Sequence, residues 1–151
     1  MAACLQQPQL KTGLEGKKIP SFKFLLIDST TVLNTDSIKQ GQSFVIFYFD
    51  PGCPHCRAEL RDIIKHNNEL KNVTFYMLTW YSHKIVKNFS NEFNLNAYSN
   101  FTIGIDYTDS LYKYFSIPSV PFLAFYDKEK RLNQVLVGKI DYKTIQSHVS
   151  P

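Results

Sequence analysis

The chain has 151 residues, of which 44% are hydrophobic, 20% charged and 15% aromatic, and this composition excludes a disordered or low-complexity protein. One domain of this length can bury a core without the support of disulfide bonds. The net charge of +4 comes from 17 Lys and Arg residues scattered among 13 Asp and Glu residues. Because nucleic-acid-binding surfaces need clustered basic residues, we expect no nucleic-acid partner.

The first residues lack hydrophobic periodicity. We predict a flexible N-terminal leader over residues 1–13 and one domain over residues 14–151. Small residues precede Cys4, which resembles the stub of a bacterial lipoprotein signal. We therefore expect a periplasmic protein or a lipoprotein anchored at Cys4 and facing the periplasm, whose signal peptide is not in this chain. The alternative is a free cysteine in a flexible tail.

Two features of the next segment predict strands. Residues 22–26 alternate in hydropathy and lead through a polar turn into residues 31–33, which predicts a hairpin. Residues 43–49 form a continuous β-branched and aromatic run, typical of a strand covered on both faces. This apolar run is also far shorter than the roughly 20 residues that cross a bilayer. We interpret it as the central strand of a sheet.

Helical and strand patterns alternate through the rest of the chain. Apolar residues at helical spacing predict helices over residues 54–70, 82–93, 109–115 and 141–149, and strands are predicted over residues 73–79, 101–105, 122–126 and 133–137. Residues 94–100 are polar and rich in Asn, and we predict a loop there. This order requires parallel strands joined by crossover connections, so the fold class is α/β.

The two cysteines at the start of the first long helix carry the chemistry. Cys53 stands where a strand turns into a helix, and there unpaired N–H groups and the helix dipole favour a thiolate. A thiolate is the nucleophile in thiol–disulfide exchange. Cys56, three residues further, lies within bonding reach and can resolve the mixed disulfide. The sequence therefore predicts Cys53 as nucleophile and Cys56 as resolving thiol, with no cofactor.

Other roles for this cysteine pair are disfavoured. A zinc site needs two further ligands at short spacing, and His66, His83 and His148 form no second paired cluster. Haem attachment needs a histidine directly after the second cysteine, where Arg57 stands. We therefore expect no metal. Two buried, inert thiols are the remaining structural alternative.

The segment around the cysteines, residues 47–60, resembles the active-site segment of the thioredoxin superfamily, especially its TlpA-like, redoxin-type thiol–disulfide oxidoreductases. The resemblance extends over residues 14–151. It implies a thioredoxin-like fold with a central mixed β-sheet flanked by helices and an N-terminal β-hairpin extension. Within this pattern Val120 and Pro121 match the cis-proline loop, which lies beside the reactive sulfur and binds the substrate backbone.

Glu59 follows Cys56 by three residues and matches a glutamate that TlpA-like proteins carry close to the active site. The resemblance implies that it handles the proton of Cys56. The alternative is an exposed acidic residue that suits the helix dipole. Phe47 stands where thioredoxins bury an aspartate, which removes the usual route for deprotonating the resolving thiol.

The direction of electron transfer stays open. Pro54 and His55 resemble the dipeptide of DsbA, which also has Val before its cis-proline, and an imidazole beside Cys53 would make the disulfide more oxidising. TlpA-like proteins, in contrast, mostly act as reductants. We expect a monomer that exchanges disulfides with protein substrates in the bacterial cell envelope, with a membrane redox partner.

Two alternative functions use the same fold. A peroxiredoxin-like peroxidase would place Thr or Ser three residues before the reactive cysteine and Pro four residues before that, but Asp50 and Ile46 stand there. A thioredoxin-fold copper chaperone would use both cysteines and a histidine. Such chaperones usually separate the cysteines by three residues, whereas here two residues separate them.

Overall fold

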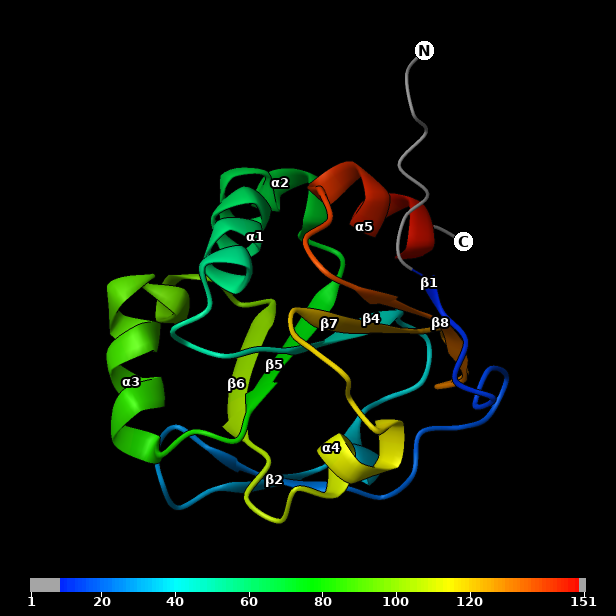
Figure 1. The fold of residues 1–151 in the computed structure, drawn as a ribbon, viewed down its shortest axis with the longest axis horizontal. Helices are drawn as coiled ribbons and strands as arrows, with labels where there is room; N and C mark the ends of the chain where they lie inside the picture. Colours follow the sequence, from blue (N-terminus) through cyan, green and yellow to red (C-terminus); the bar gives the residue numbers. More distant parts are fainter. Residues whose placement is uncertain (1–8, 150–151) are drawn as a thin grey trace.

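The computed structural model describes residues 9–149. Over these residues the chain forms one mixed sheet in the order β1-β8-β7-β4-β5-β6-β2-β3 (Figure 1). The strands are β1 (Gln9–Leu10), β2 (Lys23–Leu26), β3 (Val32–Asn34), β4 (Phe44–Tyr48), β5 (Thr74–Thr79), β6 (Phe101–Ile105), β7 (Phe122–Tyr126) and β8 (Leu132–Val137). The helices are α1 (Pro54–Lys65), α2 (Asn67–Leu70), α3 (His83–Glu92), α4 (Ser110–Phe115) and α5 (Tyr142–Val149), with 3₁₀ turns η1 (Thr35–Ser37) and η2 (Leu95–Ala97).

The centre of the sheet is β4, which pairs in parallel with β5 and antiparallel with β7. All five of its residues are buried, so the prediction of a strand covered on both faces is confirmed. β6 continues the parallel set beside β5. The carboxyl ends of β4, β5 and β6 therefore lie at one edge of the sheet, the usual place for a site in an open α/β fold.

Helices cover both faces of the sheet. Residues of α1, α3 and α5 pack with one set of β4 side chains in a single core cluster. Residues of α4 and of the N-terminal segment pack with the other set. In Figure 1, α1, α2 and α5 lie above the sheet and α4 lies below it. The structure is thus the predicted central mixed sheet flanked by helices.

The N-terminal hairpin is confirmed, because β2 pairs antiparallel with β3 and joins the sheet beside β6. The predicted leader is wrong at its end: Gln9 and Leu10 form β1, which pairs with the β8 residues Leu136 and Val135. This short strand covers what would otherwise be an open edge of the sheet. Residues 1–8, including Cys4, lie outside the described residues, so lipidation stays a prediction.

The helix predicted over residues 54–70 divides at His66, whose backbone leaves helical geometry at φ −111° and ψ 25°. Its ring stacks on Tyr142 with centroids 3.7 Å apart, which ties the break to the start of α5. The polar stretch predicted as a loop contains η2, where Leu95 is buried. Within residues 9–149 the structure has no helix long and apolar enough to cross a membrane.

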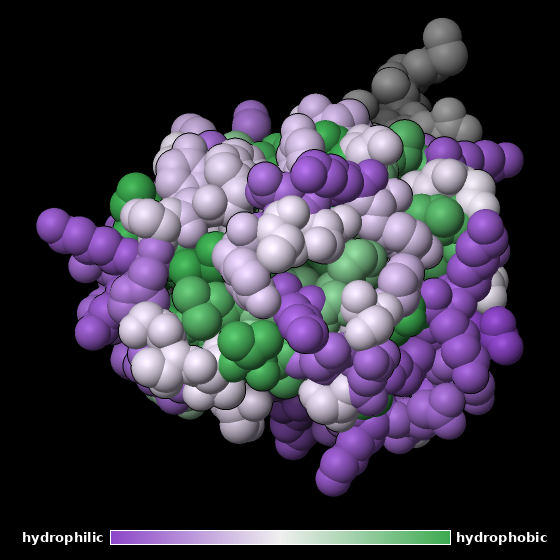
Figure 2. Space-filling view, turned by 90° about the horizontal axis from the view of Figure 1, so that it is seen from below, coloured by the Kyte–Doolittle hydropathy of each residue, from purple (hydrophilic) through white to green (hydrophobic). Residues whose placement is uncertain are grey.

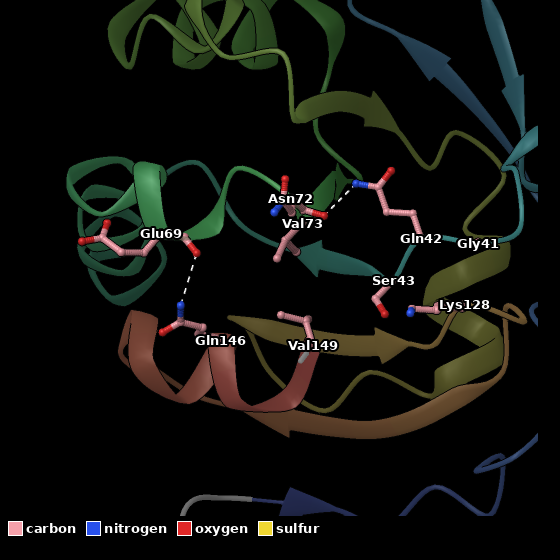
Figure 3. Close-up of a pocket in the computed structure, with 9 residues that line it drawn as sticks. All are labelled: Gly41, Gln42, Ser43, Glu69, Asn72, Val73, Lys128, Gln146 and Val149. Carbon is pink, nitrogen blue, oxygen red and sulfur yellow. Dashed lines mark hydrogen bonds between the residues drawn. The ribbon is translucent and has the colours of Figure 1, made fainter. Parts of the chain in front are cut away.

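A cleft of about 510 Å³ lies at the amino end of β4, between α2 and α5. Figure 3 shows the residues that line it. Two polar side chains in it bind backbone carbonyls: Gln42 donates to Asn72 at 2.7 Å and Gln146 donates to Glu69 at 3.4 Å. This cleft is at the opposite end of β4 from the two cysteines.

Candidate functional site

The site begins with the turn that follows β4. Asp50 accepts three hydrogen bonds there: Oδ1 from the Gly52 amide at 2.7 Å, Oδ2 from the Tyr81 hydroxyl at 3.1 Å, and the backbone carbonyl from the Cys53 amide at 3.0 Å. Aspartate is favoured in turns because its side chain can bind amides two residues on. The turn before Cys53 is therefore held both by hydrogen bonds within the turn and by the hydrogen bond from Tyr81.

Cys53 is the N-cap of α1, with extended backbone geometry and Pro54 in the first turn. Its carbonyl accepts the first helical hydrogen bond from the Arg57 amide at 3.0 Å. Its thiol is free and half-buried. The sulfur can therefore meet both a substrate and the unpaired amides of the first turn, an arrangement that suits an anionic sulfur.

Cys56 differs from Cys53 in burial. Its thiol is free and only 1% of the residue is exposed. Burial raises the pKa of the Cys56 thiol; the Asp50 backbone amide lowers it, while the Cys53 thiol and the negative charge of Glu59 raise it further. Cys56 is thus a protonated, protected thiol that needs a base before it can attack.

Glu59 lies one turn after Cys56 and is fully buried, so the alternative of an exposed acidic residue is wrong. One carboxylate oxygen accepts from the Ile140 amide at 2.9 Å, and the other, Oε2, has no hydrogen-bond partner among residues 9–149. Burial raises the pKa of Glu59 to about 8, with the nearby charge of Asp62 adding to the rise, and the Ile140 amide and Lys139 opposing it. A carboxyl that titrates near neutrality therefore stands beside the resolving thiol.

The loop before β7 completes the site. Because Phe122 pairs with Tyr48 at the end of β4, Val120 and Pro121 lie at the same sheet edge as the Asp50 turn. The Val120–Pro121 peptide bond is cis, and the Pro121 carbonyl accepts from Gly138 at 2.8 Å. Val120 packs against the core cluster that contains Cys56.

Arg57 is a site residue that the sequence reasoning missed. Its guanidinium donates to the Pro51 carbonyl at 2.8 Å and forms an ion pair with Glu92. It also lies over the rings of Phe89 and Phe93, at 5.5 and 5.0 Å from their centroids. Arg57 therefore connects the turn before Cys53 to α3. A cleft of about 360 Å³, lined in part by Arg57, lies between this turn and α3. Pro54 and His55, the predicted dipeptide, are exposed.

An aromatic surface adjoins this turn. Trp80 follows β5 and is 42% exposed; its ring stacks on Tyr48 at 5.8 Å and lies 5.2 Å from Tyr81, the partner of Asp50. Tyr112 of α4, also 42% exposed, stands 6.2 Å from Trp80. Figure 2 shows the molecule from below, where apolar and intermediate residues lie among hydrophilic ones near the centre and hydrophilic residues dominate the right and lower sides.

The structure brings together Cys53, Cys56, Glu59 and the Val120–Pro121 loop at one sheet edge. The Asp50–Tyr81 hydrogen bond was not predicted, because it joins residues 31 positions apart and depends on the pairing of β4 with β5. Within residues 9–149 there is no group of three or more His, Cys, Asp or Glu side chains that could hold a metal ion.

These features define an α/β domain of thioredoxin-like fold with a cysteine pair at a helix start. The chain belongs to the AhpC/TSA family, whose sequence model matches residues 16–135. Membership of this redoxin family supports a thiol redox function.

Solved structures share the fold at low sequence identity. DsbF of Mycobacterium tuberculosis is 20% identical, with a TM-score of 0.71 over 93% of this chain and 96% of that one. A secreted M. tuberculosis disulfide oxidoreductase homologous to E. coli DsbE is 21% identical, with a TM-score of 0.70 over 85% and 93%. AhpC of Enterococcus faecalis is 16% identical, with a TM-score of 0.71 over 89% of both chains. No curated protein sequence matches this chain.

Proposed function

We propose that the protein is a thiol–disulfide oxidoreductase that exchanges disulfides with protein substrates through Cys53 and Cys56. The observation that carries the proposal is the contrast between the two thiols. Cys53 is half-exposed at a helix start, whereas Cys56 is buried one turn further on, beside a carboxyl that titrates near neutrality. An accessible nucleophile and a protected resolving thiol are what exchange with a large substrate needs.

Reduction of a substrate disulfide proceeds in two steps. The Cys53 thiolate attacks a substrate disulfide, so a Cys53–substrate bond forms and the second substrate sulfur leaves as a thiolate, which takes a proton from water. Cys56 then transfers its proton to the Glu59 carboxylate and attacks Cys53. This closes the Cys53–Cys56 disulfide, releases the other substrate thiolate and moves two electrons to the substrate.

The reverse sequence oxidises a substrate dithiol. As the Cys53–Cys56 disulfide opens, the Cys56 sulfur leaves with the electron pair and takes a proton from neutral Glu59. With a pKa of about 8, Glu59 is mostly protonated at pH 7 and can act as this acid. The cis peptide before Pro121 and the aromatic surface at Trp80 lie on either side of the Asp50 turn, where a substrate segment would bind.

An envelope location and a membrane redox partner are part of the proposal, with the chain acting as a monomer. Support comes from the neighbours: one of the similar structures is described as a secreted disulfide oxidoreductase. Lipidation at Cys4 would anchor the domain at the membrane surface. Metabolic labelling with a radioactive fatty acid, compared between the parent chain with its native leader and Cys4→Ser, tests this.

The main test is reduction of insulin disulfides by dithiothreitol, followed as turbidity. We expect Cys53→Ser to lose the activity, because its hydroxyl cannot form the mixed disulfide. An unchanged circular dichroism spectrum and melting temperature would show that the variant is folded. A folded Cys53→Ser protein that keeps the parent activity would refute the proposal.

A second candidate is a peroxidase, favoured by the family match and by the similarity to AhpC of Enterococcus faecalis. In that reaction the Cys53 thiolate attacks a peroxide oxygen, water or an alcohol leaves, and Cys56 condenses with the sulfenic acid to form the disulfide and water. The position three residues before Cys53 argues against it, because the Asp50 carboxylate accepts hydrogen bonds there and offers no hydroxyl donor. Stopped-flow oxidation of the reduced protein by hydrogen peroxide decides between the two: rapid, stoichiometric oxidation that Cys53→Ser abolishes would favour the peroxidase.

A further inference from the structure

Two carboxylates of α1 hold the loop that connects β8 to α5. Glu59 accepts from the Ile140 amide at 2.9 Å, and Asp62 accepts from the Tyr142 amide at 2.8 Å through Oδ2. Residues three apart lie on the same side of a helix, so the two side chains meet alternate amides of one loop. This loop therefore supplies the hydrogen-bond donor of the buried Glu59.

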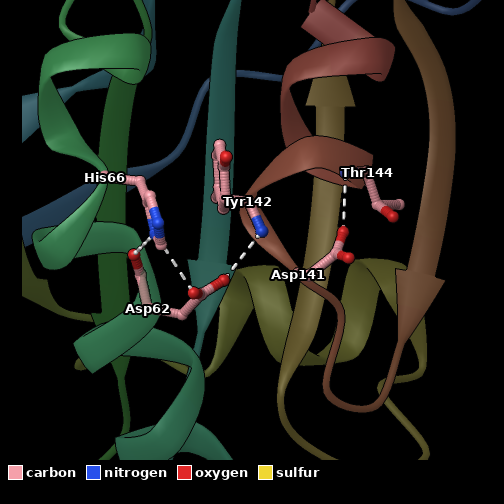
Figure 4. A network of polar contacts seen from close by, with 5 residues as sticks. All are labelled: Asp62, His66, Asp141, Tyr142 and Thr144. Carbon is pink, nitrogen blue, oxygen red and sulfur yellow. Dashed lines mark hydrogen bonds and ion pairs between the residues drawn. The ribbon is translucent and has the colours of Figure 1, made fainter.

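Asp62 is itself held in place, as Figure 4 shows. Its Oδ1 lies 3.2 Å from Nδ1 of His66, and the His66 ring stacks on Tyr142, whose amide Asp62 binds. The side chain of Asp62 is 26% exposed, whereas Glu59 is fully buried. The same loop therefore contacts two carboxyl groups: Glu59, which is buried beside the thiol pair, and Asp62, which is partly exposed to solvent.

We propose that Asp62 is a positioning residue for thiol exchange that acts through Glu59: its carboxylate fixes the loop that binds Glu59, and it places a negative charge near Glu59. This inference rests on the proposed function. Within residues 9–149, the hydrogen bond and the ion pair of the Asp62 side chain go to Tyr142 and His66 and to neither sulfur. Burial is the main cause that favours neutral Glu59, and the charge of Asp62 adds to it, which supports Glu59 as the acid that protonates Cys56 when the disulfide opens.

The charges around Glu59 make the effect specific. On α1, Cys56 precedes it and Asp62 follows it, and Lys139 faces it from the β8–α5 loop. Asp62 favours the neutral form of Glu59 and Lys139 favours the ionised form. Removing each charge should therefore move the titration of Glu59 in opposite directions.

The experiment compares Asp62→Asn with the parent protein. Asparagine keeps an oxygen for the Tyr142 amide and loses the charge. Two readouts are followed against pH: the Glu59 side-chain carbon signal in nuclear magnetic resonance, and the rate at which dithiothreitol reduces the Cys53–Cys56 disulfide. The rate is corrected for the thiolate fraction of dithiothreitol. We expect both midpoints to fall by about half a pH unit, a usual size for partly exposed charges.

Three further variants make the test decisive. Lys139→Gln should move both midpoints upward, and it keeps the inference testable if Asp62→Asn does not fold. Glu69→Gln, an exposed change of the same charge on α2, should leave them unchanged. In a Glu59→Gln background the rate should lose its midpoint, and adding Asp62→Asn should change nothing further.

Unmoved midpoints in both Asp62→Asn and Lys139→Gln would overturn the inference, and so would a rate shift from Asp62→Asn that persists in the Glu59→Gln background. Failure of the proposed function looks different, because insulin reduction would then survive Cys53→Ser. If Cys53→Ser is inactive while the midpoints stay in place, only the role of Asp62 is refuted.

Discussion

Replacing Glu59 with Gln should change how stability depends on pH. Glu59 is a fully buried acid whose pKa rises from 4.5 to about 8 on folding. The folded state therefore binds this proton more tightly than the unfolded state does between these two values. The contribution of Glu59 to stability is most favourable below pH 4.5, where the carboxyl is neutral in both states, and it is lost as the pH rises through this window towards 8.

The magnitude follows from the two pKa values. A difference of one pKa unit corresponds to about 1.4 kcal/mol, so ionising Glu59 in the folded protein costs up to about 5 kcal/mol. At pH 5 only about 1 kcal/mol of this cost is present, and at pH 8 about 4 kcal/mol. Gln has nearly the same shape, keeps an oxygen for the Ile140 amide and cannot ionise. Its stability should lack this dependence.

The assay is urea denaturation of the reduced protein at pH 5, 6, 7 and 8, for the parent and for Glu59→Gln. Because histidines and other acids contribute equally to both, the difference between the two proteins isolates Glu59. We expect the variant to gain on the parent by about 3 kcal/mol between pH 5 and pH 8. A difference that stays constant across this range would refute the burial argument and, with it, the proposed proton transfer from Cys56.

Three other substitutions test separate parts of the structure. Cys56→Ser should trap a mixed disulfide with insulin, visible on non-reducing gels, because the resolving thiol is missing; release without reductant would contradict that role. Arg57→Met should lower the free energy of unfolding by about 1–2 kcal/mol, as the contact of its charge with the Phe93 ring is lost; an unchanged urea midpoint would show that this contact is weak. Gly104→Ala should cost about 1–3 kcal/mol, because the added methyl group would stand 3.2 Å from Cβ of Phe24 in the tightly packed sheet; a stable variant would mean that β2 can shift.

The reactive pair could be predicted from the sequence because its geometry is local. One continuous segment supplies the strand, the turn and the helix, so the positions of Cys53 and Cys56 follow from periodicity and from the breaking residues between them. The ends of the sheet could not be found in this way. Gln9 and Leu10 form a strand only because β8 offers an open edge, and two residues carry no periodic signal.

The burial of Glu59 was indicated by its position on the helix, although its charge suggested an exposed residue. The buried residues of α1 are Cys56, Glu59, Leu60 and Ile63, which follow the spacing of one helix face. An acidic residue on that face is expected to be buried, whatever its charge suggests. Its partner, the Ile140 amide, could not be predicted, because it lies 81 residues away and depends on how the β8–α5 loop crosses α1.

The environment of the two sulfurs also leads to a prediction of whether the protein is an oxidant or a reductant. A couple is oxidising when its reduced form is stabilised, chiefly by a stabilised thiolate. His55 could supply this to Cys53, but it is exposed, and water and salt screen charges at the surface. Burial beside Glu59 instead raises the pKa of Cys56, so this thiol stays protonated and supplies no thiolate that would stabilise the reduced form.

We therefore expect a reducing couple, with a potential nearer that of thioredoxin, about −270 mV, than that of DsbA, about −120 mV. The measurement is equilibration with dithiothreitol redox buffers and counting of free thiols by alkylation. His55→Ala should move the potential by less than about 30 mV, which corresponds to about 1.4 kcal/mol. A potential close to that of DsbA, lost in His55→Ala, would show that the dipeptide outweighs the buried thiol.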